Sequence, residues 1–129
     1  FIPLICYEII YSGKINLNSN LTDFIINISE DGWFGNSIGP HQHFSHSIFR
    51  AIEEGKNIIR SSNNGFSAYI DANGLIINKL ESTNKGVIEI NNYKSLKKTF
   101  FSKFGNNIFF YFISIYIILI FFNYKKRER

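Results

Sequence analysis

The chain has 129 residues, enough for one folded domain, and its hydrophobic content of 45% excludes a disordered chain. The formal net charge is +4, but several basic residues crowd into the last stretch, so the charge does not indicate a nucleic-acid partner. A single cysteine excludes an internal disulfide framework. The sequence contains no methionine and begins with phenylalanine, so we expect a processed or partial chain.

An apolar stretch opens the chain and carries its only cysteine. Residues 1–10 read FIPLICYEII, a run typical of a strand that is buried on both faces of an α/β sheet. We expect the paired strand to begin at Leu4, because Pro3 cannot donate a ladder hydrogen bond. Cys6 would then lie at the carboxyl end of the strand, where ligands bind in open α/β sheets.

Glu8 is the local carboxylate beside this thiol. On a strand its side chain would point to the same side as that of Cys6, two residues earlier. A free cysteine is more often a small buried apolar side chain, and a lone carboxylate is more often a structural ion-pair partner. The stretch alone therefore leaves both a catalytic and a structural interpretation open.

Residues 22–29 predict a second buried strand, since their apolar members are mostly β-branched or aromatic. Residues 30–40 then form a loop with three glycines, one proline and the only tryptophan. Loops of this kind carry function disproportionately. Trp33 and Phe34 either line an apolar substrate pocket or pack onto the core, and the sequence does not choose between the two.

Three histidines follow this loop. His41 and His43 would align on a strand and His43 and His46 on a helix, so no single element places all three on one face. This spacing argues against a metal site, although imidazole is a common zinc ligand.

The spacing becomes helical from Phe44 onward, with an apolar stripe that continues through Ile48, Ala51 and Ile52. Gly55 ends the predicted helix. Away from the stripe lie Arg50, Glu53 and Glu54. We expect Arg50 and Glu54, four residues apart, to pair on the surface.

Further strands are predicted over residues 57–62, 66–70, 75–80 and 87–90. Asp71-Ala72-Asn73-Gly74 is a strong hairpin signal between the second and third of these. The alternation of strands with a helix indicates a layered α/β domain.

The last part of the chain predicts a membrane span. No charged residue occurs from Phe104 to Tyr124, and at ~1.5 Å per residue this length crosses a hydrocarbon core of ~30 Å. We expect a linker over residues 93–104, a transmembrane helix over 105–124 and a basic tail over 125–129. The positive tail marks the cytoplasmic side, so the α/β domain would lie across the membrane. A buried core helix is the alternative.

Five blocks of sequence, in order and at matching spacing, resemble the apolipoprotein N-acyltransferases of bacteria. These are membrane-embedded members of the nitrilase, or carbon–nitrogen hydrolase, superfamily. The blocks are Ile5-Cys6-Tyr7-Glu8-Ile9, Asn27-Ile28-Ser29-Glu30-Asp31-Gly32-Trp33-Phe34-Gly35, Gly39-Pro40-His41-Gln42-His43, Arg50-Ala51-Ile52-Glu53 and Arg60-Ser61-Ser62-Asn63-Asn64-Gly65. The resemblance implies that residues 1–92 are the C-terminal part of a carbon–nitrogen hydrolase domain. It also implies an α/β fold, part of a nitrilase-type α-β-β-α sandwich, followed by one C-terminal transmembrane helix.

The resemblance also implies a reaction and its site residues. Cys6, as thiolate, would take an acyl chain from a membrane phospholipid as a thioester and pass it to the α-amino group of the diacylglyceryl-cysteine of an apolipoprotein. Glu8 matches a glutamate that orients the site, and Tyr7, Trp33 and Phe34 match the pocket. The resemblance implies no cofactor, metal or nucleic acid. It implies the bacterial inner membrane, with the catalytic domain on the periplasmic side.

The sequence departs from this family in two ways. The base glutamate and the oxyanion-stabilising lysine of the family precede the cysteine, where this chain has five residues, and Glu30 and Gly32 replace the commoner asparagine and alanine. We therefore expect a C-terminal portion that is inactive alone. Two other functions stay open: a nitrilase-type amidase that acts on small amides, and a non-catalytic, membrane-anchored remnant or binding module.

Overall fold

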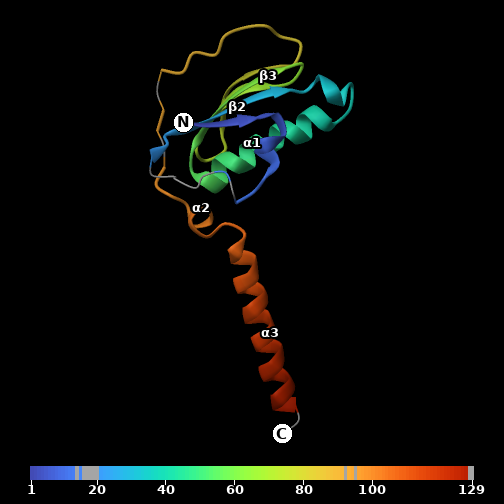
Figure 1. Cartoon of the computed structure of the whole chain (residues 1–129), viewed down its shortest axis with the longest axis vertical. Coiled ribbons are helices and arrows are strands. Elements are labelled where there is room, and N and C mark those ends of the chain that lie inside the picture. Colours follow the sequence, from blue (N-terminus) through green and yellow to red (C-terminus); the bar gives the residue numbers. More distant parts are fainter. Residues whose placement is uncertain (14, 16–20, 92, 95, 128–129) are drawn as a thin grey trace.

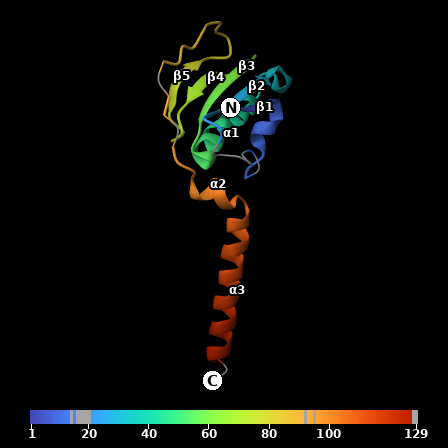
Figure 2. The same cartoon turned by 60° about the vertical axis from the view of Figure 1, so that its left-hand side comes forward.

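A computed structural model of the chain describes residues 1–13, 15, 21–91, 93–94 and 96–127. One five-stranded sheet organises the domain, in the order β1-β2-β3-β4-β5 (Figures 1 and 2). Its strands are β1 (Ile2–Ile5), β2 (Phe24–Glu30), β3 (Asn57–Asn63), β4 (Ser67–Ile70) and β5 (Ile76–Leu80). The first three strands are parallel, whereas β4 and β5 are antiparallel to their neighbours. The sheet is therefore mixed, as expected of an α/β domain.

Helix α1 (Gly39–Glu54) connects β2 to β3 and packs on one face of the sheet (Figure 1). The core between them is apolar and consists of Leu4, Ile9, Ile25, Phe44, Ala51, Ile58, Phe66, Ala68 and Ile70. Gly55 ends the helix in the left-handed conformation, with φ of 62°, which confirms the predicted end. The helix begins five residues before Phe44, with Pro40 in its first turn, a position that suits proline.

The opening apolar run is not one strand. β1 ends at Ile5, and a 3₁₀ helix, η1 (Cys6–Ile10), follows at once. The expectation that strand alternation aligns Glu8 with Cys6 is therefore wrong. Pro3 lies inside the paired part of β1, opposite Ile26, because β1 is an edge strand of this sheet and tolerates a missing donor.

Two further predictions fail. Arg50 and Glu54 are buried, at 4% and 2% exposure, and the Arg50 guanidinium binds Glu53 at 2.8 Å rather than Glu54 on the surface. The last turns of α1 carry charged side chains on the face that packs against the domain. A charged residue in this helix therefore does not identify the face exposed to solvent. Residues 87–90 form no strand, because β5 pairs with β4 and no ladder in the described part of the chain reaches these residues.

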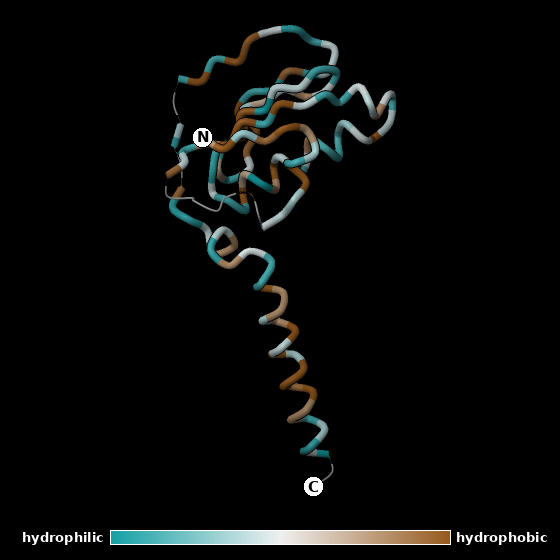
Figure 3. Tube along the Cα trace, viewed as in Figure 1, coloured by the Kyte–Doolittle hydropathy of each residue, from teal (hydrophilic) through white to brown (hydrophobic). Residues whose placement is uncertain are grey.

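The chain leaves the domain through a short helix, α2 (Phe100–Phe104), and then a long one, α3 (Asn107–Arg127). Figures 1 and 3 show α3 projecting away from the sheet, with apolar residues along most of its length. Its segment Asn107–Lys125 has a mean hydropathy of 1.8 and no burial against the rest of the described chain. By length and composition this helix is able to cross a membrane. The residues expected to form a linker contain α2.

Candidate active site

Cys6 lies at the carboxyl end of β1, as the sequence predicts, and occupies a sharp turn there, which the sequence does not predict. Its φ is 49°, in the left-handed region that residues with a side chain rarely adopt. The turn joins β1 to η1 and leaves the thiol partly exposed. Strained conformations of this kind cost about 1–3 kcal/mol and gather at functional sites. The only cysteine of the chain therefore lies at the carboxyl ends of the strands, where α/β proteins bind ligands.

Two of the predicted pocket residues meet beside this turn. The Tyr7 ring lies 5.1 Å from the His43 ring and 5.9 Å from the Phe34 ring, centroid to centroid. A cavity of about 120 Å³ lies here, lined by Tyr7, Ile10, Phe34, Gly39, Gln42, His43 and His46. This is smaller than a complete ligand pocket of roughly 300–1,000 Å³. The three rings thus form one wall of a site, rather than enclosing a ligand by themselves.

Trp33 does not join this wall. It lies on a short 3₁₀ helix, η3 (Gly32–Phe34), and its side chain is 88% exposed. It therefore neither packs onto the core nor lines the cavity beside Tyr7 and Phe34. A role for Trp33 in binding stays a prediction.

Glu8 contacts the turn from outside. Its carboxylate accepts a hydrogen bond of 2.6 Å from the backbone N–H of Ile5, three residues earlier. The side chain thereby closes the turn that carries Cys6. This contact fits the orienting role implied by the resemblance, which stays a prediction.

A buried polar cluster lies beneath the cysteine. Asp31 lies at its centre and accepts hydrogen bonds from Ser29 at 2.8 Å and from Arg60 at 2.8 and 3.0 Å, while His43 Nδ1 lies 2.8 Å from the same carboxylate. Arg60 also donates to Asn27. Each of the five residues is at least 94% buried. We call these residues the Asp31 cluster: Asn27, Ser29, Asp31, His43 and Arg60.

Asp31 is held as a carboxylate. Burial alone would raise its pKa, but the His43 hydrogen bond, the Arg60 charge and the Ser29 hydroxyl together hold the pKa well below its usual range. Burial lowers the pKa of Arg60, and the charge of Asp31 opposes that effect. A buried charge is stable only when it is paired and hydrogen-bonded, and this pair meets both conditions.

The Asp31 cluster reaches Cys6 at two points. Ser29 Oγ lies 3.8 Å from Cys6 Sγ, and His43 Nε2 lies 3.3 Å from the Cys6 carbonyl oxygen. Asn27 adds a hydrogen bond of 3.1 Å to the carbonyl of Leu4, at the end of β1. The thiol and the backbone of the strained turn therefore contact side chains that also contact the buried Asp31 carboxylate.

Sequence reasoning missed the Asp31 cluster. His43 was weighed only as a metal ligand, and in the structure its ring binds the Asp31 carboxylate instead. One available signal was Arg60, a charged residue inside a stretch predicted to be a strand, since arginine is almost never fully buried without a partner. The partner was not deducible, because Asp31 is 29 residues earlier and meets Arg60 only when β2 pairs with β3.

Glu30, one of the departures from the family pattern, is held by neighbouring hydrogen-bond donors. Its carboxylate accepts hydrogen bonds from Gly32 N at 2.6 Å and from the side-chain amides of Asn63 and Asn64. The amide of Asn64 contributes most to a pKa of Glu30 below its usual value. The carboxylate therefore fastens the aromatic loop to the turn that follows β3.

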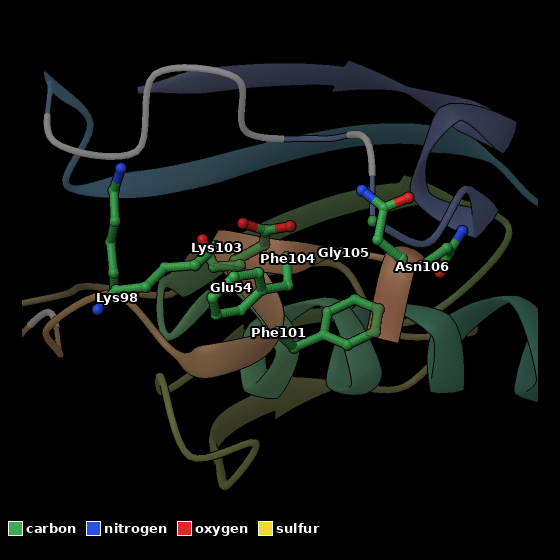
Figure 4. A pocket seen from close by; sticks show the side chains of 10 residues that line it. Glu54, Lys98, Phe101, Lys103, Phe104, Gly105 and Asn106 are labelled. Carbon is green, nitrogen blue, oxygen red and sulfur yellow. The ribbon is translucent and has the colours of Figure 1, made fainter. Parts of the chain in front are cut away.

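A second cavity, of about 480 Å³, lies at the base of the domain (Figure 4). The end of α1, α2 and the start of α3 enclose it, and its charged lining residues are Glu54, Lys98 and Lys103. Burial raises the pKa of Glu54, whose Oε2 has no hydrogen-bond partner. This cavity shares no lining residue with the one beside Tyr7 and lies at the opposite end of α1.

The mixed sheet is consistent with the comparison to protein families. Residues 2–91 match the model described as "Carbon-nitrogen hydrolase", and the chain belongs to that family. Its relatives include proteins named "Apolipoprotein N-acyltransferase". Those of Wigglesworthia glossinidia brevipalpis and Rickettsia bellii are each 43% identical over 122 residues, covering 94% and 90% of this chain. The one of Rickettsia prowazekii is 44% identical over 119 residues. The chain spans about a quarter of the length of these relatives, 24% in each case.

Proposed function

We propose that this chain takes part in the N-acylation of lipoproteins and supplies the cysteine nucleophile of that reaction. The observation that carries the proposal is the position of Cys6, on a strained turn directly above a buried ion pair. The named relatives support the coarse activity, transfer of an acyl group in lipoprotein maturation.

The reaction proceeds in two displacement steps. In the first, a base takes the proton of the Cys6 thiol and the thiolate attacks the carbonyl carbon of a phospholipid acyl ester. A C–S bond forms, the C–O bond breaks, and the leaving oxygen takes that proton from the base to give the lysophospholipid alcohol. In the second, the α-amino group of the diacylglyceryl-cysteine attacks the thioester, an amide forms, and the amine proton passes to a base as the thiolate leaves. A thiolate suits both steps, because it is a strong nucleophile and a good leaving group.

The described residues account for part of this chemistry. The Asp31 cluster fixes the nucleophile, and Tyr7 and Phe34 offer an apolar wall beside it. The resemblance assigns the base and the oxyanion donor to a glutamate and a lysine that precede the cysteine in the family. We therefore propose that the 129 residues act within a longer chain and are inactive alone.

The membrane completes the proposal. With α3 as a span, the short helix α2 and the phenylalanines Phe100, Phe101 and Phe104 lie where the chain enters the bilayer. The basic tail then lies on the cytoplasmic side and the domain on the periplasmic side, by the positive-inside rule.

The test uses the full-length protein in membranes, supplied with a phospholipid labelled in its acyl chain. Trapping of the label on Cys6, sensitive to hydroxylamine and absent from Cys6→Ala, supports the thioester. Ser82→Ala is the matched control, since Ser82 is exposed and lies outside the site. Transferase activity retained by Cys6→Ala contradicts the assignment of the nucleophile. Release of ammonia from small amides would favour an amidase instead.

A further inference from the structure

The hydroxyl of Ser29 lies within hydrogen-bonding distance of the Cys6 sulfur. Ser29 lies on β2, is 6% exposed, and its hydroxyl oxygen is 3.8 Å from Cys6 Sγ and 2.8 Å from Asp31 Oδ1. A serine hydroxyl carries one hydrogen and can donate to one of the two at a time. The Ser29 hydroxyl therefore lies between the Cys6 sulfur and the ionised carboxylate of Asp31.

Asp31 does not depend on the Ser29 hydrogen. Its two oxygens also face the Arg60 guanidinium, at 2.8 and 3.0 Å, and the His43 ring, at 2.8 Å. When the hydroxyl turns to the sulfur, the carboxylate keeps these donors and is not left unsatisfied. The cost of that rotation is small compared with the cost of orphaning a buried charge.

Contacts to the backbone hold Cys6 beside Ser29. Cys6 has φ of 49°, and its carbonyl oxygen lies 3.3 Å from His43 Nε2 and 3.5 Å from Asn27 Nδ2. These contacts fix the backbone of Cys6 and, with it, the position of the Cβ atom that carries the sulfur. The Asp31 cluster thus contacts the backbone of the turn and also contains the Ser29 hydroxyl that faces the sulfur.

We propose that Ser29 is a positioning residue for the Cys6 nucleophile. With the thiol protonated, its hydroxyl donates to Asp31 and its oxygen can accept the S–H. When the thiolate forms, the hydroxyl turns and donates to the sulfur, so that it stabilises the charged form and holds it in place. This inference rests on the proposed role of Cys6, and it adds a residue to which the resemblance assigns no role.

The experiment compares two variants of the full-length protein in its membranes, Ser29→Thr and Ser29→Val. The two new side chains have nearly the same shape and differ in the hydroxyl group. The rate at which iodoacetamide alkylates Cys6 is followed against pH, by mass spectrometry of the peptide that contains Cys6. Ser82→Ala is the control for the substitution procedure, and the unfolding temperature of every variant is recorded.

The expected result is a hydroxyl-dependent shift of the alkylation profile. Ser29→Thr keeps the midpoint near that of the unmodified protein, whereas Ser29→Val moves it to higher pH and slows alkylation at neutral pH by roughly fivefold, the factor expected of one ordinary hydrogen bond. Equal profiles for the two variants overturn the proposal. If the branched side chains prevent folding, Ser29→Ala replaces Ser29→Val and is compared with the unmodified protein. A midpoint unchanged in Ser29→Ala overturns the proposal equally.

This readout is independent of the transferase reaction. If Cys6→Ala retains transferase activity, the proposed function of Cys6 fails, whatever Ser29 does to the thiol. If Cys6 is essential and the two Ser29 profiles coincide, the positioning role alone fails.

Discussion

The substitution Asp31→Asn removes one charge from the Asp31 cluster and preserves its shape. The side chains of Asp31 and Arg60 are 0% exposed and 2.8 Å apart, so the substitution leaves a guanidinium buried without a counter-ion. Removing one partner of a buried pair costs about 3–5 kcal/mol. Since domains are typically stable by about 5–15 kcal/mol, we expect loss of about a fifth or more of the stability.

The assay is urea-titrated pulse proteolysis of the full-length protein in mild detergent. Asp23→Asn is the control, because Asp23 is exposed, and surface substitutions usually change stability by less than about 0.5 kcal/mol. Adding Arg60→Met to Asp31→Asn should recover part of the loss, since the orphaned cation is removed. A loss below about 1 kcal/mol for Asp31→Asn would refute the reasoning from the buried pair.

The pH dependence follows from the same carboxylate. The pKa of Asp31 is lower in the folded chain than in the unfolded one, so its contribution is present above the unfolded pKa of about 3.9 and is lost as pH falls below it. The unmodified protein should therefore lose stability on acidification below about pH 4, and Asp31→Asn should show a flatter profile over that range.

Three further outcomes are expected. Gly65→Ala places a methyl group against the Asp31 carboxylate and 2.5 Å from Ser62 Oγ, so it should lower stability by about 1–3 kcal/mol in the same assay; an unchanged protein would contradict the close approach. Cys6→Gly should be more stable than Cys6→Ala by about 1 kcal/mol, because glycine adopts positive φ freely; equal urea midpoints would contradict strain at the turn. Glu54→Gln should raise the unfolding temperature at pH 8 more than at pH 5, because burial raises the pKa of Glu54 and its ionisation destabilises the fold as pH rises; an equal gain at both pH values would contradict this.

Parts of the fold were predictable because the residues that set them are local. Gly55 marks the end of α1 by its left-handed conformation, and residues 71–74 form the turn between β4 and β5. The first apolar run was not predictable in this way. Its length suits a strand or a buried helix equally, and the change from β1 to η1 occurs at Cys6, a residue whose positive φ no local signal announces.

The position of Cys6 in the candidate site was predictable from the sequence, whereas the residues that contact it were not. Cys6 follows an apolar strand, which places it at the functional edge of the sheet. Its support comes from three elements, with Asp31 after β2, His43 in α1 and Arg60 in β3. The register that pairs Asn27 of β2 with Arg60 of β3 brings Arg60 close to Asp31. A pairing between residues so far apart in the chain has no signature in a short window of sequence.

The stability of the domain alone does not account for the Asp31 cluster. Well-packed apolar residues in place of a buried ion pair are often neutral or stabilising, so charges at this depth need another reason. The contacts of the cluster supply one, since they end on the carbonyl and the sulfur of Cys6. An apolar core beneath the turn would offer neither contact, and would leave a residue at φ of 49° free to relax. We therefore interpret the ion pair as support for Cys6, the candidate nucleophile, at its positive φ.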